Sequence, residues 1–98
     1  MKSKILIVDD EKDVEMLFRQ KFRKEIKSGS LELCFAFSGD EALTVLDSEH
    51  PPQVVYVFSD INMPGMSGLE LLEKIKNRFP QINVSMISDY GDSQNYEK

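Results

Sequence analysis

One stretch decides the fold of this chain: VVYVFSDINMPGMSGLELL, Val54 to Leu72. An apolar run, broken only by Tyr56, leads directly into Asp60, and a Met-Pro-Gly turn and a helix-like segment follow. Such a run is typical of a strand buried on both faces, where a charged group is costly unless it is paired. Asp60 therefore either forms a turn or displays a carboxylate for chemistry at the end of a strand.

The rest of the sequence alternates between strand-like and helix-like segments. Short apolar runs predict four strands, and apolar residues at helical spacing predict helices between them. This alternation favours one α/β domain over residues 1–98, with a doubly wound parallel sheet and helices on both faces. The expected strands are Lys4–Val8, Leu31–Phe37, Val54–Ser59 and Ile82–Ile87, and the expected helices are Lys12–Ile26 and two that open on capping-box patterns at Ser38–Glu41 and Ser67–Glu70.

Composition excludes several classes of protein. The formal charge of −5 argues against direct nucleic-acid binding, which needs a basic face. A single cysteine, Cys34, cannot form an internal disulfide, so a disulfide-built secreted domain is not expected. The apolar residues Ile5–Val8 are too few for a signal peptide or a membrane span. We therefore expect a cytoplasmic protein without membrane insertion.

Acidic and hydroxyl side chains follow three of the predicted strands. The first strand ends in Asp9 and Asp10, the third in Asp60, and the fourth in Ser88. Ligands of open α/β sheets bind beyond the carboxyl ends of the strands. If the first and third strands are neighbours, the three carboxylates repel one another, and a divalent cation offsets this repulsion. Magnesium prefers such oxygen ligands, and an aspartate can also accept a phosphoryl group.

Three motifs carry a resemblance to a known family. The segments ILIVDDE, SDINMPGMSGLELL and SMISDYGD resemble the receiver domain of two-component response regulators, over nearly the whole chain. The resemblance implies a flavodoxin/CheY-like sheet with strand order 2-1-3-4. It also implies that Asp60 takes a phosphoryl group from a histidine kinase or phosphotransfer protein. Ser88 would then turn inward and bond that group when the interaction surface of the domain switches.

The same resemblance implies a magnesium site. Asp10 would bind Mg²⁺ directly and Asp9 chiefly through water, with Asp60 and the backbone carbonyl of Asn62 as further ligands. The family consists of phosphoacceptor domains that assist their own phosphorylation and dephosphorylation. The resemblance therefore implies that this chain is not an enzyme acting on outside substrates.

Two features depart from the family pattern. Receivers usually carry a small residue after the switch hydroxyl, whereas Asp89 follows Ser88 here. The family also continues with a helix, a strand that ends in an essential lysine, and a last helix, and Lys98 does not occupy that lysine position. We expect the chain to be an incomplete receiver that dimerises or exchanges elements through the edge of its fourth strand, near Val84 and Met86.

Other interpretations of these residues stay open at this point. Asp10 alone is equally well explained as a helix N-cap. A serine at the end of a strand, such as Ser88, is often only a turn residue, although the switch role is favoured here. A receiver-like interaction module that works without phosphate is an alternative function. An aspartate-based phosphohydrolase of the haloacid dehalogenase type needs Asp-x-Asp at the first strand, but this chain has Asp9-Asp10 there.

Overall fold

The computed structural model describes residues 3–48 and 53–87, which form a four-stranded sheet with only parallel pairings. The strand order is β2-β1-β3-β4, as the resemblance implied, so the first and third strands are direct neighbours. The predicted parallel α/β sheet is therefore confirmed. The strands are β1 Ser3–Val8, β2 Leu31–Ala36, β3 Val54–Asp60 and β4 Asn83–Ile87.

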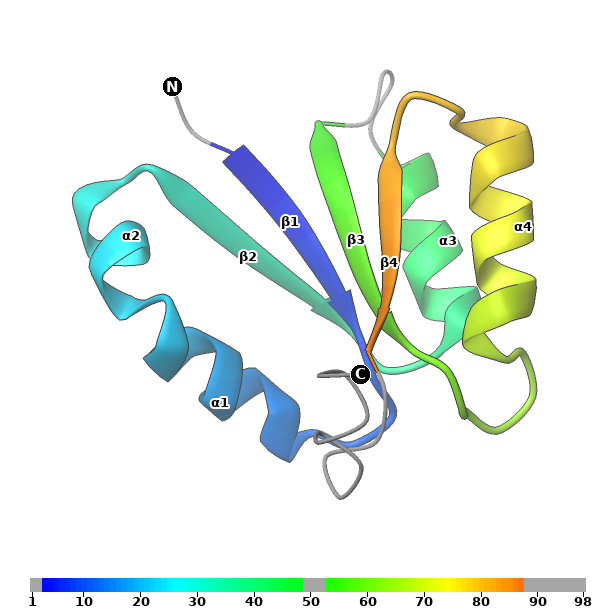
Figure 1. The fold of residues 1–98 in the computed structure, drawn as a ribbon, viewed down its shortest axis with the longest axis horizontal. Helices are drawn as coiled ribbons and strands as arrows, with labels where there is room; N and C mark the ends of the chain where they lie inside the picture. Colours follow the sequence, from blue (N-terminus) through cyan, green and yellow to red (C-terminus); the bar gives the residue numbers. More distant parts are fainter. Residues whose placement is uncertain (1–2, 49–52, 88–98) are drawn as a thin grey trace, which may run out of the picture.

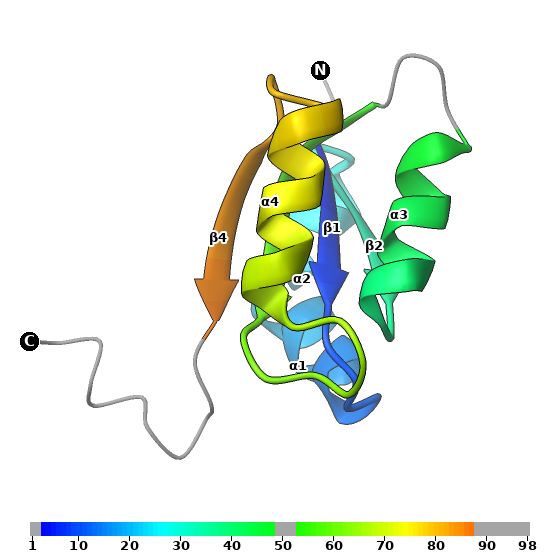
Figure 2. The same cartoon turned by 90° about the vertical axis from the view of Figure 1, so that its right-hand side faces the viewer.

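Helices lie on both faces of this sheet, as Figures 1 and 2 show. Because successive side chains of a strand point to opposite faces, β1 contributes buried side chains to both faces of the sheet. Leu6 and Val8 belong to the core beneath the third and fourth helices. Ile7 is also buried but points to the opposite face of the sheet. The helices are α1 Asp13–Lys21 and α2 Arg23–Ser28 on one face, and α3 Gly39–Asp47 and α4 Gly68–Arg78 on the other.

The segment predicted as one helix, Lys12–Ile26, is two helices, and the prediction of continuity was wrong. Phe22 leaves the helical conformation, with φ −107° and ψ 27°. The bonds from the Phe22 N–H to the Phe18 carbonyl (3.0 Å) and from the Ile26 N–H to the Phe22 carbonyl (2.9 Å) still cross the break. The apolar spacing is therefore kept through it, and periodicity alone does not reveal a distortion of one residue.

Both predicted capping boxes begin helices. The Ser38 hydroxyl accepts a hydrogen bond from the Glu41 N–H (3.1 Å), and the Ser67 hydroxyl accepts one from the Glu70 N–H (3.2 Å). The Glu41 carboxylate also accepts a bond from the Phe37 N–H (2.7 Å). This bond gives that N–H a partner beyond β2, which ends one residue earlier than predicted.

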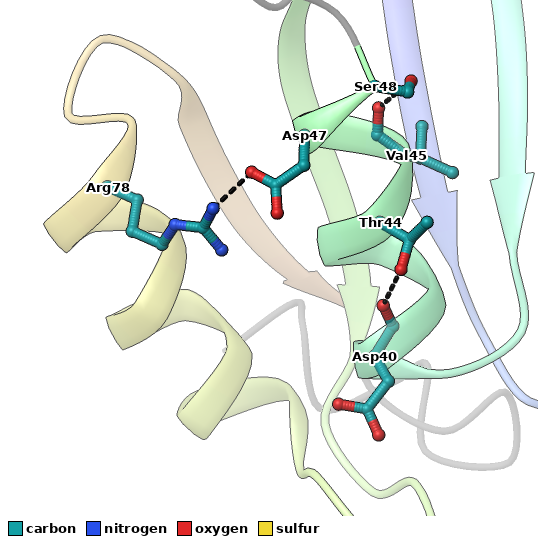
Figure 3. A network of polar contacts seen from close by, with 6 residues as sticks. All are labelled: Asp40, Thr44, Val45, Asp47, Ser48 and Arg78. Atoms are coloured by element: carbon teal, nitrogen blue, oxygen red, sulfur yellow. Dashed lines mark hydrogen bonds and ion pairs between the residues drawn. The ribbon is translucent and has the colours of Figure 1, made fainter.

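The main core lies between the sheet and the helices α3 and α4. Its side chains are almost completely removed from solvent and come from every layer on that face. Arg78 of α4 forms an ion pair with Asp47 of α3 across the surface (Figure 3). Exposed ion pairs contribute little, so buried apolar area holds these helices in place. The largest fully buried side chains of this core are Leu6, Leu46, Leu71, Ile75 and Ile82.

Helix α3 carries two further hydroxyl contacts in the region drawn in Figure 3. Thr44 donates a hydrogen bond to the Asp40 carbonyl (3.1 Å), and Ser48 donates one to the Val45 carbonyl (2.6 Å). The second bond adds a donor to the Val45 carbonyl near the end of the helix, which also accepts from the Ser48 N–H (3.2 Å). Within residues 3–48 and 53–87, no helix combines the length and apolar character needed to cross a bilayer.

We predict that Leu71→Ala lowers the free energy of unfolding by roughly 2–5 kcal/mol, because Leu71 is fully buried and its removal leaves a cavity. Leu69→Ala, in the same helix, is the matched control, since Leu69 is 57% exposed. Its effect should stay within about 0.5 kcal/mol. Urea unfolding followed by circular dichroism measures both, and equal losses would contradict this account of the core.

Candidate metal and phosphoacceptor site

Three carboxylates converge where β1 and β3 end. Val8 pairs with Ser59, so the residues that follow, Asp9 and Asp60, come side by side at the carboxyl edge of the sheet. Asp10 is next along the chain. Each of the three aspartates offers a ligand oxygen, and these oxygens all lie within 4.8 Å of one another. In Figures 1 and 2 this edge is at the bottom of the sheet.

The three carboxylates differ in their exposure to solvent. Asp9 is only 5% exposed, Asp60 is half-buried and Asp10 is exposed. Asp9 is held by two hydrogen bonds: its N–H donates to the Ala36 carbonyl (3.1 Å), and its Oδ1 accepts from the Glu11 N–H (2.9 Å). The innermost carboxylate is therefore fixed in position, while the other two remain accessible from outside.

Burial raises the pKa of the Asp9 carboxyl from 3.8 to about 6. The hydrogen bond from the Glu11 N–H lowers this pKa, but the negative charges of Asp60, Asp10 and Glu11 raise it further. The charged form of Asp9 is thus unfavourable without a compensating cation. The site combines oxygen ligands with clustered negative charge, which is the environment that suits a hard divalent cation such as Mg²⁺.

The first helix does not use Asp10 as its cap. The N-cap position of α1 is occupied by Lys12, and no side chain caps it. The alternative that Asp10 serves as the N-cap is therefore wrong. Asp10 instead stands in the loop before the helix, beside Asp9 and Asp60.

Asp60 belongs to the strand and not to a turn. β3 reaches one residue further than predicted, and Asp60 pairs with Ile87 of β4. The Ser59 hydroxyl donates a hydrogen bond to the Asp60 carbonyl (3.0 Å). The interpretation of Asp60 as turn chemistry is thus not supported, because its backbone is extended and paired.

The loop after β3 contains a buried residue, Met63, whose burial was not predicted from the sequence. Met63 is only 8% exposed and packs into the main core, although it lies in the loop. The signal was an apolar residue three positions after Asp60, which the sequence analysis had assigned to the turn. The packing of Met63 restrains the segment that carries Asn62, which is itself exposed.

The roles predicted for Ser88 and for the backbone carbonyl of Asn62 stay predictions. Ser88, the predicted switch hydroxyl, and Asp89 lie outside the described residues, as does Lys98. Ser88 directly follows Ile87, the strand partner of Asp60. The backbone carbonyl of Asn62 lies in the loop two residues after Asp60, and its part in metal binding stays a prediction.

Comparison with known proteins decides the family. The family model described as the response regulator receiver domain matches residues 5–98. The chain belongs to this family. Receiver domains bind Mg²⁺ at an acidic pocket and interact with histidine kinases or phosphotransfer proteins. In this chain, Asp9, Asp10 and Asp60 form an acidic cluster at the carboxyl edge of the sheet.

Curated relatives are response regulators of different lengths. The chain is 34% identical to sporulation initiation phosphotransferase F of Bacillus subtilis, over 94% of this chain and 68% of that protein. It is 34% identical to response regulator protein FleR of Pseudomonas aeruginosa, over 93% of this chain but 18% of that protein. The receiver thus spans about two thirds of the first relative and less than a fifth of the second.

Solved structures of receivers share the fold. The response regulator TrrA from Thermotoga maritima, in complex with Mg²⁺-BeF, is 30% identical and has a TM-score of 0.76, with 97% of this chain and 76% of that one covered. TrrA in complex with histidine kinase ThkA is 32% identical with a TM-score of 0.76, over 92% of this chain and 71% of that one.

We predict that Asp9→Asn stabilises the metal-free receiver by about 2 kcal/mol at pH 7, because the neutral amide avoids the cost of a buried charge. The raised pKa means that the protonated form of Asp9 is favoured by folding. The penalty is therefore absent below pH 3.8 and grows as the pH rises to about 6. Urea unfolding of both proteins across this range measures the difference.

The stability gap between wild type and Asp9→Asn should shrink as the pH falls from about 6 to about 4. Millimolar Mg²⁺ should raise the melting temperature of the wild type at pH 7 and have a much smaller effect on Asp9→Asn. A gap that stays constant with pH would contradict the assignment of the raised pKa to Asp9.

Proposed function

We propose that this receiver is a phosphoacceptor switch in which Asp60 receives a phosphoryl group from a histidine kinase or phosphotransfer protein. The observation that carries the proposal is the convergence of Asp9, Asp10 and Asp60 within 4.8 Å at the carboxyl edge of a receiver sheet. Asp60 is the best placed acceptor because it is half-buried on a paired strand, whereas Asp9 is covered and Asp10 lies in a loop.

The chemistry is an in-line transfer. A carboxylate oxygen of Asp60 attacks phosphorus, and the bond from phosphorus to the imidazole nitrogen of the donor breaks, with the electron pair leaving on that nitrogen. The product is an aspartyl phosphate. Mg²⁺, when bound, neutralises charge on the phosphoryl oxygens, so the protein's contribution is chiefly positioning. Asp9 and Asp10 hold negative oxygens where that cation is needed.

We assign Asp9, Asp10, Asp60 and the carbonyl of Asn62 as magnesium ligands. The donor set is entirely oxygen, as Mg²⁺ prefers, and one or two carboxylates leave room for water and phosphate. The complex of TrrA with Mg²⁺-BeF, at 30% identity, supports this assignment by similarity. Ser88, one residue beyond β4, is proposed to bond the phosphoryl group and couple it to a change of surface.

A sensor kinase or a phosphotransfer protein is the proposed partner. The complex between ThkA and TrrA supports a kinase partner by similarity, as does the likeness to the sporulation phosphotransferase. In this proposal the receiver works in the cytoplasm and does not bind nucleic acid itself. It assists its own phosphorylation and dephosphorylation but turns over no outside substrate.

We predict that acetyl phosphate with Mg²⁺ adds one phosphoryl group to the wild type, seen by intact-mass spectrometry. Asp60 attacks phosphorus as in transfer from a kinase, but here the P–O bond of acetyl phosphate breaks and acetate is the leaving group. Asp60→Asn should abolish the adduct, because the amide is not a nucleophile of this kind. Omission of Mg²⁺ should reduce it strongly. Circular dichroism first establishes that both proteins are folded.

Absence of an adduct on folded wild type would overturn the phosphoacceptor proposal. The protein would then be better explained as a receiver-like interaction module that works without phosphate. Release of phosphate from an external phosphate ester, with turnover, would instead point to a phosphohydrolase. The experiment therefore distinguishes a phosphoacceptor, an interaction module that works without phosphate, and a phosphohydrolase.

We further propose that the chain associates through the outer edge of β4. Within residues 3–48 and 53–87, β4 pairs only with β3. On the face shared with α1, the rings of Tyr56 and Phe58 stack at 4.7 Å and are only half-buried, and the Tyr56 hydroxyl contacts that of Ser85 (2.7 Å). An unpaired strand edge beside half-exposed aromatic rings favours a second copy.

Sedimentation velocity tests this association. The weight-average mass should rise with protein concentration, and Asn83→Lys at the exposed start of β4 should reduce the rise, since a lysine on an edge strand opposes pairing. A monomer of constant mass at every concentration would rule out the edge as an interface.

A further inference from the structure

Two helices of this receiver begin with the same pattern. Ser38-Gly39-Asp40-Glu41 opens α3, and Ser67-Gly68-Leu69-Glu70 opens α4. In both, the serine caps the helix, and the glycine is its first residue and is buried. Neither glycine has a positive φ, which within the described residues occurs only at Gly29 and Gly65. Backbone conformation therefore does not explain why glycine stands at either position.

The two glycines differ in what a side chain would meet. A Cβ at Gly39 would approach only side-chain atoms of Met66, with Sδ at 2.7 Å and Cβ at 3.0 Å; the flexible thioether end can move aside, and the contact at Cβ needs a shift of a few tenths of an ångström. A Cβ at Gly68 would lie 2.1 Å from the carbonyl oxygen of Asp60 and 3.0 Å from the Cα of Ile61. The obstacle at Gly68 is thus the backbone of the phosphoacceptor itself.

The contact at Gly68 joins the start of α4 to the end of β3. The Gly68 N–H donates a hydrogen bond to the Ile61 carbonyl (2.8 Å), which fixes the two segments in register. Leu71, three residues after Gly68 in α4, is fully buried in the core. Movement of α4 away from the sheet would therefore expose this side chain. A methyl group at residue 68 would therefore push α4 and the Asp60 backbone apart, and the buried Leu71 opposes movement of the helix.

We propose that Gly68 is a positioning residue for the acceptor aspartate. Its missing side chain lets α4 set the position of the Asp60 backbone, and with it the distance from the Asp60 carboxylate to Asp9 and Asp10. The inference deepens the proposed function and rests on it for the phosphoryl step. A displacement of about 1 Å at a reacting group can slow a reaction about 100-fold.

The matched pair Gly68→Ala and Gly39→Ala tests the proposal. Both replace the first helical residue after a serine cap, so their effects on helix propensity are alike. Gly68→Ala should bind Mg²⁺ about 10-fold more weakly than wild type. It should also be labelled by acetyl phosphate about 10- to 100-fold more slowly. Gly39→Ala should stay close to wild type in both measurements.

Three readouts separate positioning from a merely structural role. Urea unfolding gives the stability of each variant, calorimetry with Mg²⁺ alone gives affinity, and intact mass gives the labelling rate. In metal-free protein, the ¹⁵N-NMR amide shifts of residues 60 and 61 should move further in Gly68→Ala than in Gly39→Ala. Equal Mg²⁺ affinities, labelling rates and amide shifts in the two folded variants would overturn the positioning role, even if Gly68→Ala were less stable.

Failure of this inference is distinguishable from failure of the proposed function. If wild type takes no phosphoryl group, the proposed function fails, while the Mg²⁺ affinities and the amide shifts still decide the role of Gly68. If Gly68→Ala does not fold alone, trimethylamine N-oxide is added to all three proteins to favour the compact state, and the same comparison is made.

Discussion

Parallel pairing of β1 with β3 brings Val8 opposite Ser59, and this register forces Asp9 and Asp60 to share one edge of the sheet. A slip of one residue would turn each side chain to the opposite face, so the register also determines which residues reach the core. The crowding of negative charge at this edge is thus a consequence of how the sheet is packed. Asp9 is the buried member of this cluster, and its burial beside two other carboxylates makes its charged form unfavourable.

The main core and the site depend on the same elements. Leu71 and Ile75 hold α4 against the sheet, and the first turn of α4 touches the backbone of Asp60. Met63 anchors the loop between them. Apolar burial supplies most of the free energy for these contacts, whereas the exposed ion pair between Arg78 and Asp47 supplies little. The site is therefore positioned by packing at some distance from its charged groups.

Much of this architecture could be predicted from the sequence. The apolar runs and the two serine caps depend on local spacing, and the sheet order came from the family resemblance. The distortion at Phe22 could not be predicted, because the apolar spacing continues through it. The position of Lys12 at the N-cap of α1 could not be predicted either, since aspartate is a favoured N-cap residue and lysine is not. The close contact between Gly68 and Asp60 requires three-dimensional packing, which no spacing encodes.

The central claim is that the clustered carboxylates make Asp60 a phosphoryl acceptor. The most direct test is to treat the receiver with acetyl phosphate and Mg²⁺, reduce the product with borohydride, and map it by tandem mass spectrometry. Reduction of an aspartyl phosphate leaves homoserine, which marks the labelled position. The account predicts homoserine at position 60 and only when Mg²⁺ is present. Homoserine at another aspartate, or none on folded protein, would contradict it.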